Sequence, residues 1–184
     1  METPANFGSV WESLSQADRE TISTAFQPMG NVSAENMVTS AGHIASLVGY
    51  LRTPGLRDLG YRLIASSESL LSLETDPVQL HFYFQGVGKF FYRFRDLDNF
   101  ALPKAIEAFE KQTRLSTICA PLLAKSLGGS PPSHAGFDQL RIIHEKAGNH
   151  LEAIKVCEVA CKDGWAGDWE KHIKRLTAKI MRAG

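Results

Sequence analysis

Proline, glycine, asparagine and aspartate residues interrupt this 184-residue chain so often that every hydrophobic pattern is short, and this punctuation is the strongest constraint on the fold. Between the interruptions, apolar residues recur at spacings of three and four, as on one face of a helix. No segment shows the alternation of a half-buried strand. About eight helices are predicted, over residues 15–26, 34–51, 56–73, 77–95, 103–121, 134–146, 151–162 and 169–181. The pattern therefore predicts an all-α protein.

Capping residues mark the starts of several of these helices. Ser15 can cap the first helix, with Asp18 placed three residues on as in a capping box. Ser33 is expected to cap the second helix, and Asn149, followed by Glu152, the seventh. Asp76-Pro77 supplies a cap and a first-turn proline to the fourth helix.

Other residues are expected to end helices. Pro28 and Gly30 should stop the first helix. Pro121 should end or kink the helix that begins at Pro103, because proline lacks the backbone donor and clashes one turn back. The run Gly128-Gly129-Ser130-Pro131-Pro132 is the clearest break in the chain and could be either a hinge or an ordered turn.

Composition narrows the functional classes. The 20 basic and 20 acidic residues give a formal net charge of zero, which argues against a dedicated nucleic-acid-binding protein. The N-terminal sequence lacks the basic and apolar regions of a signal peptide, and no apolar run approaches the length of a membrane span. The three cysteines are too few and odd in number for a disulfide framework. A cytoplasmic protein with reduced thiols, and no membrane partner, is expected.

The segment between Phe137 and Trp165 carries a repeat signal. Phe137, Leu140, Arg141 and His144 occupy the helix positions that the tetratricopeptide repeat (TPR) pattern fills with an aromatic, a leucine, a small residue and an aromatic; a turn at Gly148-Asn149 then leads to Ala153, Cys157 and Ala160. The segment thus resembles a TPR. Arg141, His144 and Trp165 depart from the pattern, as is typical of a terminal repeat.

Weaker copies precede this repeat. Phe84, Val87, Gly88 and Phe91, followed by Ala105, Ile106 and Phe109, resemble a second helix pair, and residues 34–73 a third. The run from Gly167 to Lys171 is similar to the ends of uncharacterised bacterial TPR-like proteins. The resemblance implies a single all-helical domain over residues 1–184, built as a short superhelical array of antiparallel helix pairs. Its predicted parts are a one-helix extension (1–32), divergent pairs (33–127), the best pair (134–163) and a capping helix (168–182).

The resemblance also implies a function. TPR proteins bind peptides or partner surfaces across a concave face lined by the first helix of each pair. Carried over by pattern, the candidate partner-binding residues are Phe82, Gln85, Lys89, Tyr92, Arg93, Asp138, Ile142 and Glu145. A non-catalytic interaction module or scaffold is therefore expected. The Lys/Asn/Arg clamp with which one TPR subfamily holds chaperone C-termini is not supplied by Gln85, Lys89, Asp138 and Ile142.

Alternative readings of the sequence remain open. The aromatic-rich fourth helix could drive homo-oligomerisation. The run from Lys89 to Arg95 mixes bases with aromatics, a composition that could bind single-stranded nucleic acid, although a helix would spread these side chains around its axis.

Signals for chemistry are weak. Cys157 and Cys161 lie one helical turn apart, where His150 or His172 could approach, but buried cysteine is common and no metal or cofactor is predicted. No catalytic motif is present, and Gly86-Val-Gly-Lys89 resembles a phosphate-binding loop only superficially because it lies within a helical pattern. The sequence therefore predicts neither catalytic residues nor enzymatic activity.

Overall fold

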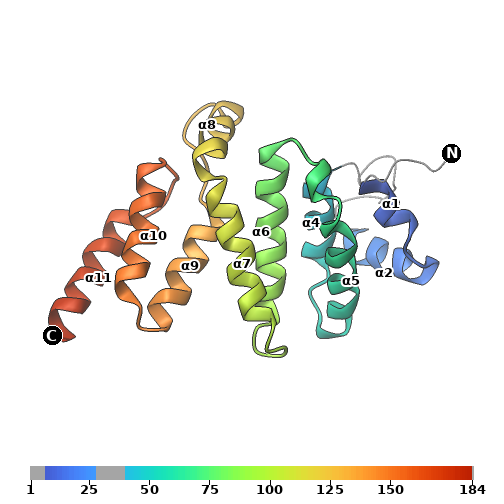
Figure 1. The fold of residues 1–184 in the computed structure, drawn as a ribbon, viewed down its shortest axis with the longest axis horizontal. Helices are drawn as coiled ribbons and strands as arrows, with labels where there is room; N and C mark the ends of the chain where they lie inside the picture. Colours follow the sequence, from blue (N-terminus) through green and yellow to red (C-terminus); the bar gives the residue numbers. More distant parts are fainter. Residues whose placement is uncertain (1–6, 28–39, 184) are drawn as a thin grey trace. The chain divides into compact units, whose positions relative to one another are not determined.

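The computed structural model describes residues 7–27 and 40–183, and this part of the chain contains ten α-helices, two 3₁₀ turns and no strand (Figure 1). The all-α prediction is confirmed. The α-helices are α1 Phe7–Glu12, α2 Gln16–Phe26, α4 Ala41–Tyr50, α5 Arg57–Glu68, α6 Pro77–Arg93, α7 Ala101–Arg114, α8 Ser116–Leu127, α9 Ala135–Lys146, α10 His150–Lys162 and α11 Trp169–Ala183. The 3₁₀ turns are Pro54–Leu56 and Leu71–Leu73. Helix α1 was not predicted.

The chain divides into two compact units, residues 1–105 and residues 106–184, called here unit 1 and unit 2. The boundary falls inside α7, where the sequence shows no break. None of the helices in the described residues is both long enough and apolar enough to cross a lipid bilayer.

Two of the predicted helix starts are confirmed. The Ser15 hydroxyl accepts a hydrogen bond from the backbone N–H of Asp18 at 3.1 Å, and the Asp76 carboxylate accepts one from Val78 at 2.8 Å, with Pro77 in the first turn. Asn149 precedes α10 as predicted, but its side chain makes no capping hydrogen bond. The predicted signals at Pro28, Gly30 and Ser33, and the predicted start of the second helix at residue 34, lie outside the described residues.

The helix that begins near Pro103 ends before it reaches Pro121, so the prediction that Pro121 ends or kinks that helix is wrong. The break occurs at Leu115, whose N–H bonds to the carbonyl of Gln112 at 3.1 Å as the first helix tightens. A new helix begins at once, since the Cys119 N–H bonds to the Leu115 carbonyl at 2.9 Å. Pro121 lies within α8, on its exposed side, where it removes a single backbone donor. Pro103 falls in the first turn of α7, where backbone N–H groups have no partner within the helix.

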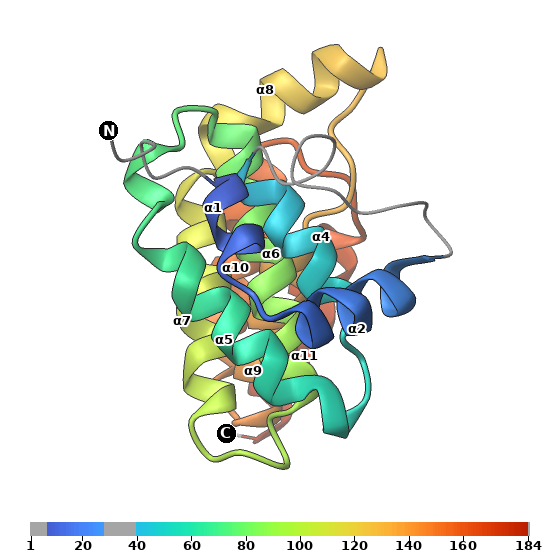
Figure 2. The same cartoon turned by 90° about the vertical axis from the view of Figure 1, so that its right-hand side faces the viewer.

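Unit 1 is built around α4, α5 and α6, which pack against one another (Figure 1 and Figure 2). Gly86 allows α6 to approach α4: a Cβ atom at this position would lie 2.6 Å from the Cβ of Ala45. Gly60 of α5 likewise leaves room for the ring of Phe90, which a Cβ atom at this position would clash with. Gly42 of α4 lies against Gln79, so contacts advance along both helices together and α4 and α6 run in the same direction.

Unit 2 has its main helix packing among α9, α10 and α11. Ala153 and Ala160 of α10 are fully buried, in agreement with the close helix approach predicted for them. Gly148 joins α9 to α10 with a φ of 79°, as predicted for a left-handed helix end. Phe137 near the start of α9 faces Trp169 at the start of α11, with ring centroids 6.3 Å apart.

The Gly128–Pro132 segment begins with an ordered helix end and is followed by an isolated β-bridge. Gly128 ends α8 with a φ of 69°, and Gly129 donates to the carbonyl of Ala124 at 3.0 Å. Ser133 then forms an isolated β-bridge with Ala166 of the α10–α11 loop. The following residue, His134, is fully buried and caps α9 by accepting a hydrogen bond from Phe137 at 3.2 Å.

Candidate interaction surface

The candidate residues in unit 1 share one side of α6. Positions 82, 85, 89, 92 and 93 fall within a narrow sector of a helix with 3.6 residues per turn. Phe82 is 39% exposed, Lys89 and Arg93 are exposed, and Gln85 and Tyr92 are half-buried. An exposed phenylalanine is informative here because Tyr83, Phe90 and Phe91 of the same helix are buried.

The opposite side of α6 forms the core of unit 1. Tyr83, Phe90 and Phe94 are almost fully buried, and Phe90 packs edge-on against Tyr61 at 5.5 Å. The Tyr83 hydroxyl lies 2.9 Å from the Ser67 hydroxyl, so its polar atom is satisfied. Burial raises the pKa of Tyr83 to about 12, and the tyrosine remains neutral.

Helix α4 contributes to the same surface at its C-terminal end. Since α4 and α6 run in the same direction, their last turns lie at the same end of unit 1. Tyr50 is the final residue of α4, and the guanidinium of Arg52 lies over its ring at 5.1 Å. Arg52 Nε also donates to the Gly49 carbonyl at 3.1 Å, which orients the guanidinium.

Two arginines lie at this end, because Arg93 follows Gly86 by about two turns on the side of α6 that approaches α4, and Arg52 follows the last turn of α4. Partial desolvation, and next the positive charge of Arg52, lower the pKa of the Arg93 guanidinium from its usual value. The guanidinium of a third arginine, Arg95, stacks over the Tyr92 ring at 4.3 Å, donates to the Tyr92 carbonyl at 2.8 Å, and pairs with Asp96 at 3.2 Å. We call the surface formed by Phe82, Gln85, Lys89, Tyr92 and Arg93 with Tyr50 and Arg52 the α4–α6 face.

The candidate residues in unit 2 are half-buried, and their carboxylates are engaged within that unit. Asp138 lies 3.4 Å from Arg141. Glu145 accepts a hydrogen bond from Arg175 Nη2 at 2.7 Å, and Lys179 lies 3.8 Å from it. The hydrogen bond from Arg175 is the main cause that lowers the pKa of Glu145 to about 2. Glu145 therefore joins α9 to α11, whereas Asp138 pairs within α9.

Arg141 shows how unit 2 accommodates a departure from the repeat pattern. The side chain takes a position where the TPR pattern has a small residue, and it is buried. Its charge is balanced by Asp138 at 3.4 Å and Glu145 at 3.6 Å on the same helix. The acids that resembled groove residues thus neutralise a buried cation.

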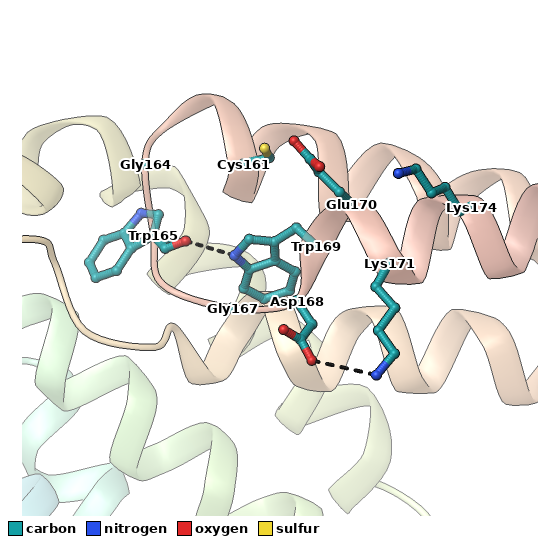
Figure 3. A pocket seen from close by; sticks show the side chains of 9 residues that line it. All are labelled: Cys161, Gly164, Trp165, Gly167, Asp168, Trp169, Glu170, Lys171 and Lys174. Atoms are coloured by element: carbon teal, nitrogen blue, oxygen red, sulfur yellow. Dashed lines mark hydrogen bonds and ion pairs between the residues drawn. The ribbon is translucent and has the colours of Figure 1, made fainter.

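A shallow hollow of about 660 Å³ lies where the α10–α11 loop meets α11 (Figure 3). Its lining residues are Cys161, Gly164, Trp165, Gly167, Asp168, Trp169, Glu170, Lys171 and Lys174. Both tryptophans are buried, and Trp169 Nε1 donates to the Trp165 carbonyl at 2.8 Å. The loop is thereby held in place by its own side chains.

A buried polar cluster fixes the position of the α10–α11 loop, which lines this hollow. Trp165 Nε1 donates to the Ser116 hydroxyl at 2.8 Å, and Ser116 in turn donates a hydrogen bond to the Asp163 carboxylate. Asp163 thus meets the start of α8, which has no capping side chain of its own at Leu115. The cluster joins α8 to the α10–α11 loop.

Cysteine and histidine side chains do not gather around a common point. Cys157 is buried and Cys161 is exposed, so the two thiols lie in different environments. Burial raises the pKa of Cys157 to about 11, which disfavours the thiolate that binds metals. Across residues 7–27 and 40–183, no group of three His, Cys, Asp or Glu side chains is arranged to hold a metal ion.

Tyr50 and Arg52 were missed by the sequence analysis. They carry no motif, and they lie in a segment whose TPR resemblance is weak. Their relation to Arg93 depends on α4 packing beside α6, 41 residues further along the chain. The chain matches no protein-family model, and neither a curated protein nor a solved structure matches it.

Proposed function

We propose that this protein is a non-catalytic interaction module that binds a protein or peptide through the α4–α6 face. The observation that carries the proposal is the gathering of an exposed phenylalanine, two tyrosines and three cations on one side of two adjacent helices. Aromatic and arginine side chains are the residues most enriched in protein-binding hot spots. Lys89 and Arg93 are exposed, and no ion pair joins either of them to another described residue.

The TPR-like arrangement is part of this proposal, and the helix directions support it. Phe137 meets Trp169 near the helix starts, while Glu145 meets Arg175 further along, so α9 and α11 run in the same direction. Helices α4 and α6 do the same in unit 1. Such alternation is expected of stacked antiparallel helix pairs, in which every first helix lies beside the next first helix.

The test is affinity capture from lysate of the native host with the full chain as bait. The Lys89→Glu/Tyr92→Ala variant should lose a specific partner that the unchanged protein retains. A matched control is Lys162→Glu/Leu151→Ala, since both control residues are exposed on α10 and the charge change is the same. Circular dichroism should show equal helix content in all three proteins. Capture that both variants retain equally would contradict the assignment of the α4–α6 face.

A second candidate function is self-assembly, and a different surface favours it. The aromatics of α6 that suggested it from sequence are mostly buried, but α8 exposes Ile118 (55%), Leu122 (44%) and Leu127 (63%). Ile118 and Leu122 lie one turn apart and form an apolar strip. Light scattering should then show an oligomer that Ile118→Asp/Leu122→Asp dissociates. A strict monomer at high protein concentration would exclude this function.

A further inference from the structure

We infer that the α4–α6 face recognises an acidic peptide segment of a partner, whose carboxylates bind Arg52 and Arg93 and whose apolar side chain packs on Phe82. The inference deepens the proposed function and rests on it.

The arrangement of the two arginines is the first argument. The guanidinium of Arg52 is held over Tyr50 and donates to the Gly49 carbonyl, so less conformational entropy is lost when a ligand binds it. Arg93 lies about two turns beyond Gly86 on the side of α6 that approaches α4, and the positive charge of Arg52 acts on it. No carboxylate among the described residues forms an ion pair with either of them, whereas Arg57, Arg62 and Arg95 each have an acidic partner.

Two neighbouring cations that form no ion pair with a carboxylate of the described residues favour an anion. Each guanidinium can bind a carboxylate with two parallel hydrogen bonds, which are stronger than hydrogen bonds between neutral groups. An arriving carboxylate would also relieve the repulsion between the two cations. Two carboxylates, or one carboxylate shared between the guanidiniums, would pair with the charges of Arg52 and Arg93.

The dimensions of the face predict the spacing in the peptide. Phe82 and Arg93 are 11 residues apart on α6, which corresponds to roughly 16 Å along a helix axis. An extended peptide covers this distance in about five residues. Lys89 and Gln85 lie between the two ends. The predicted ligand therefore carries an apolar side chain and a pair of acidic residues about five positions apart.

The charge of unit 1 favours an acidic peptide over a nucleic acid. Residues 1–105 contain 8 Lys and Arg but 11 Asp and Glu, so a long polyanion would meet repulsion beyond the two arginines. Phe90, Phe91 and Phe94 are buried and cannot stack on bases, and the Arg95 guanidinium already lies over the ring of Tyr92. A short acidic segment matches the local cluster without that penalty.

The experiment measures binding of labelled peptides to the full chain by fluorescence anisotropy at low salt. The main probe is a ten-residue peptide in which a leucine and a pair of glutamates lie five positions apart. Two comparison probes are the same peptide with lysines in place of the glutamates, and an oligothymidylate of 12 nucleotides. The acidic peptide should bind, and the lysine peptide and the oligonucleotide should not. The Arg52→Glu/Arg93→Glu variant should bind the acidic peptide with an affinity at least about tenfold lower.

The control variant is Lys162→Glu/Arg182→Glu, which changes the net charge equally at two exposed positions of unit 2 and should leave the affinity unchanged. Equal loss in both variants would show a non-specific charge effect and overturn the inference. Binding of the oligonucleotide in place of the acidic peptide would also overturn it, as would binding of neither probe.

Failure of the inference differs from failure of the proposed function. If a partner captured from lysate is lost with Lys89→Glu/Tyr92→Ala but retained with Arg52→Glu/Arg93→Glu, the face binds a protein and the acidic-peptide inference is wrong. If no variant of the face affects capture, the proposed function itself is wrong.

Discussion

Arg175 on α11 donates hydrogen bonds from both of its Nη atoms to the two carboxylate oxygens of Glu145 on α9, with 2.7 Å between Nη2 and Oε2. This bidentate pair joins residues 30 positions apart in unit 2. Glu145 is also the neighbour of the buried Arg141, at 3.6 Å. One carboxylate thus balances a surface cation and a buried cation together.

We expect this pair to make the stability of unit 2 sensitive to acid. The pKa of Glu145 is about 2 in the folded protein against an ordinary 4.5. A lowered carboxylate pKa stabilises the fold above pH 4.5, and that stabilisation is lost as the pH falls from 4.5 towards 2. Because the pair is partly exposed, the loss should be about 1 kcal/mol.

Urea denaturation monitored by circular dichroism at pH 7 and pH 3 checks this expectation. Glu145→Gln should lower the free energy of unfolding at pH 7, and it should reduce the difference in that free energy between pH 7 and pH 3. Glu158→Gln is the control, because Glu158 is exposed on α10. An unchanged acid sensitivity in Glu145→Gln would show that other carboxylates cause it.

His81 should make the stability of unit 1 depend on pH in a higher range than the range set by Glu145. This residue of α6 is 2% exposed, and burial lowers its pKa to about 4 from 6.5. The folded state therefore favours neutral His81, and stability declines as the pH falls from 6.5 to 4, by at most about 3 kcal/mol. NMR titration of the histidine ring protons checks the pKa directly. A ring that titrates near 6.5 in the folded protein would contradict the prediction.

Gly86 should be intolerant of any side chain. A Cβ atom there would lie 2.6 Å from the Cβ of Ala45 and 3.0 Å from its carbonyl oxygen, so α4 and α6 would have to separate. Gly86→Ala should destabilise the protein by about 1–3 kcal/mol, measured by urea denaturation.

Two matched variants make this test specific. Gly49→Ala changes a glycine of α4 at a position where an added Cβ would meet no packing atom within 4 Å. This substitution should be neutral or slightly stabilising. Adding Ala45→Gly to Gly86→Ala should restore part of the lost stability, because it removes the atom nearest the new methyl group. Equal effects of Gly86→Ala and Gly49→Ala would show that α4 and α6 do not approach as described.

Ser116 should be a structural residue of unit 2. Its hydroxyl accepts from Trp165 Nε1 and donates to Asp163, so Ser116→Ala leaves a buried indole N–H without its acceptor. The expected loss of stability is about 1–3 kcal/mol. Thermal unfolding followed by tryptophan fluorescence measures it. Ser126→Ala, at an exposed position of α8, should leave the midpoint unchanged.

Local sequence signals predicted most helix positions correctly. Ser15, Asp76-Pro77 and Gly148 act within one helical turn of themselves, so their effect can be read from neighbouring residues alone. The same locality explains the error at Pro121. Whether a proline ends a helix depends on the strain that the surrounding packing tolerates, and here the chain breaks at Leu115 instead.

The sequence by itself determined the all-α class, most helix starts and the side of α6 that carries Phe82, Lys89 and Arg93, because helix periodicity places residues three and four apart on one side. Only the tertiary structure decided which charges remain available. It brought the segment of Arg52, after α4, to the end of α6 that carries Arg93, and it engaged Glu145 with Arg175. Both relations join segments 30 or more residues apart, and no local preference encodes which helices pack together.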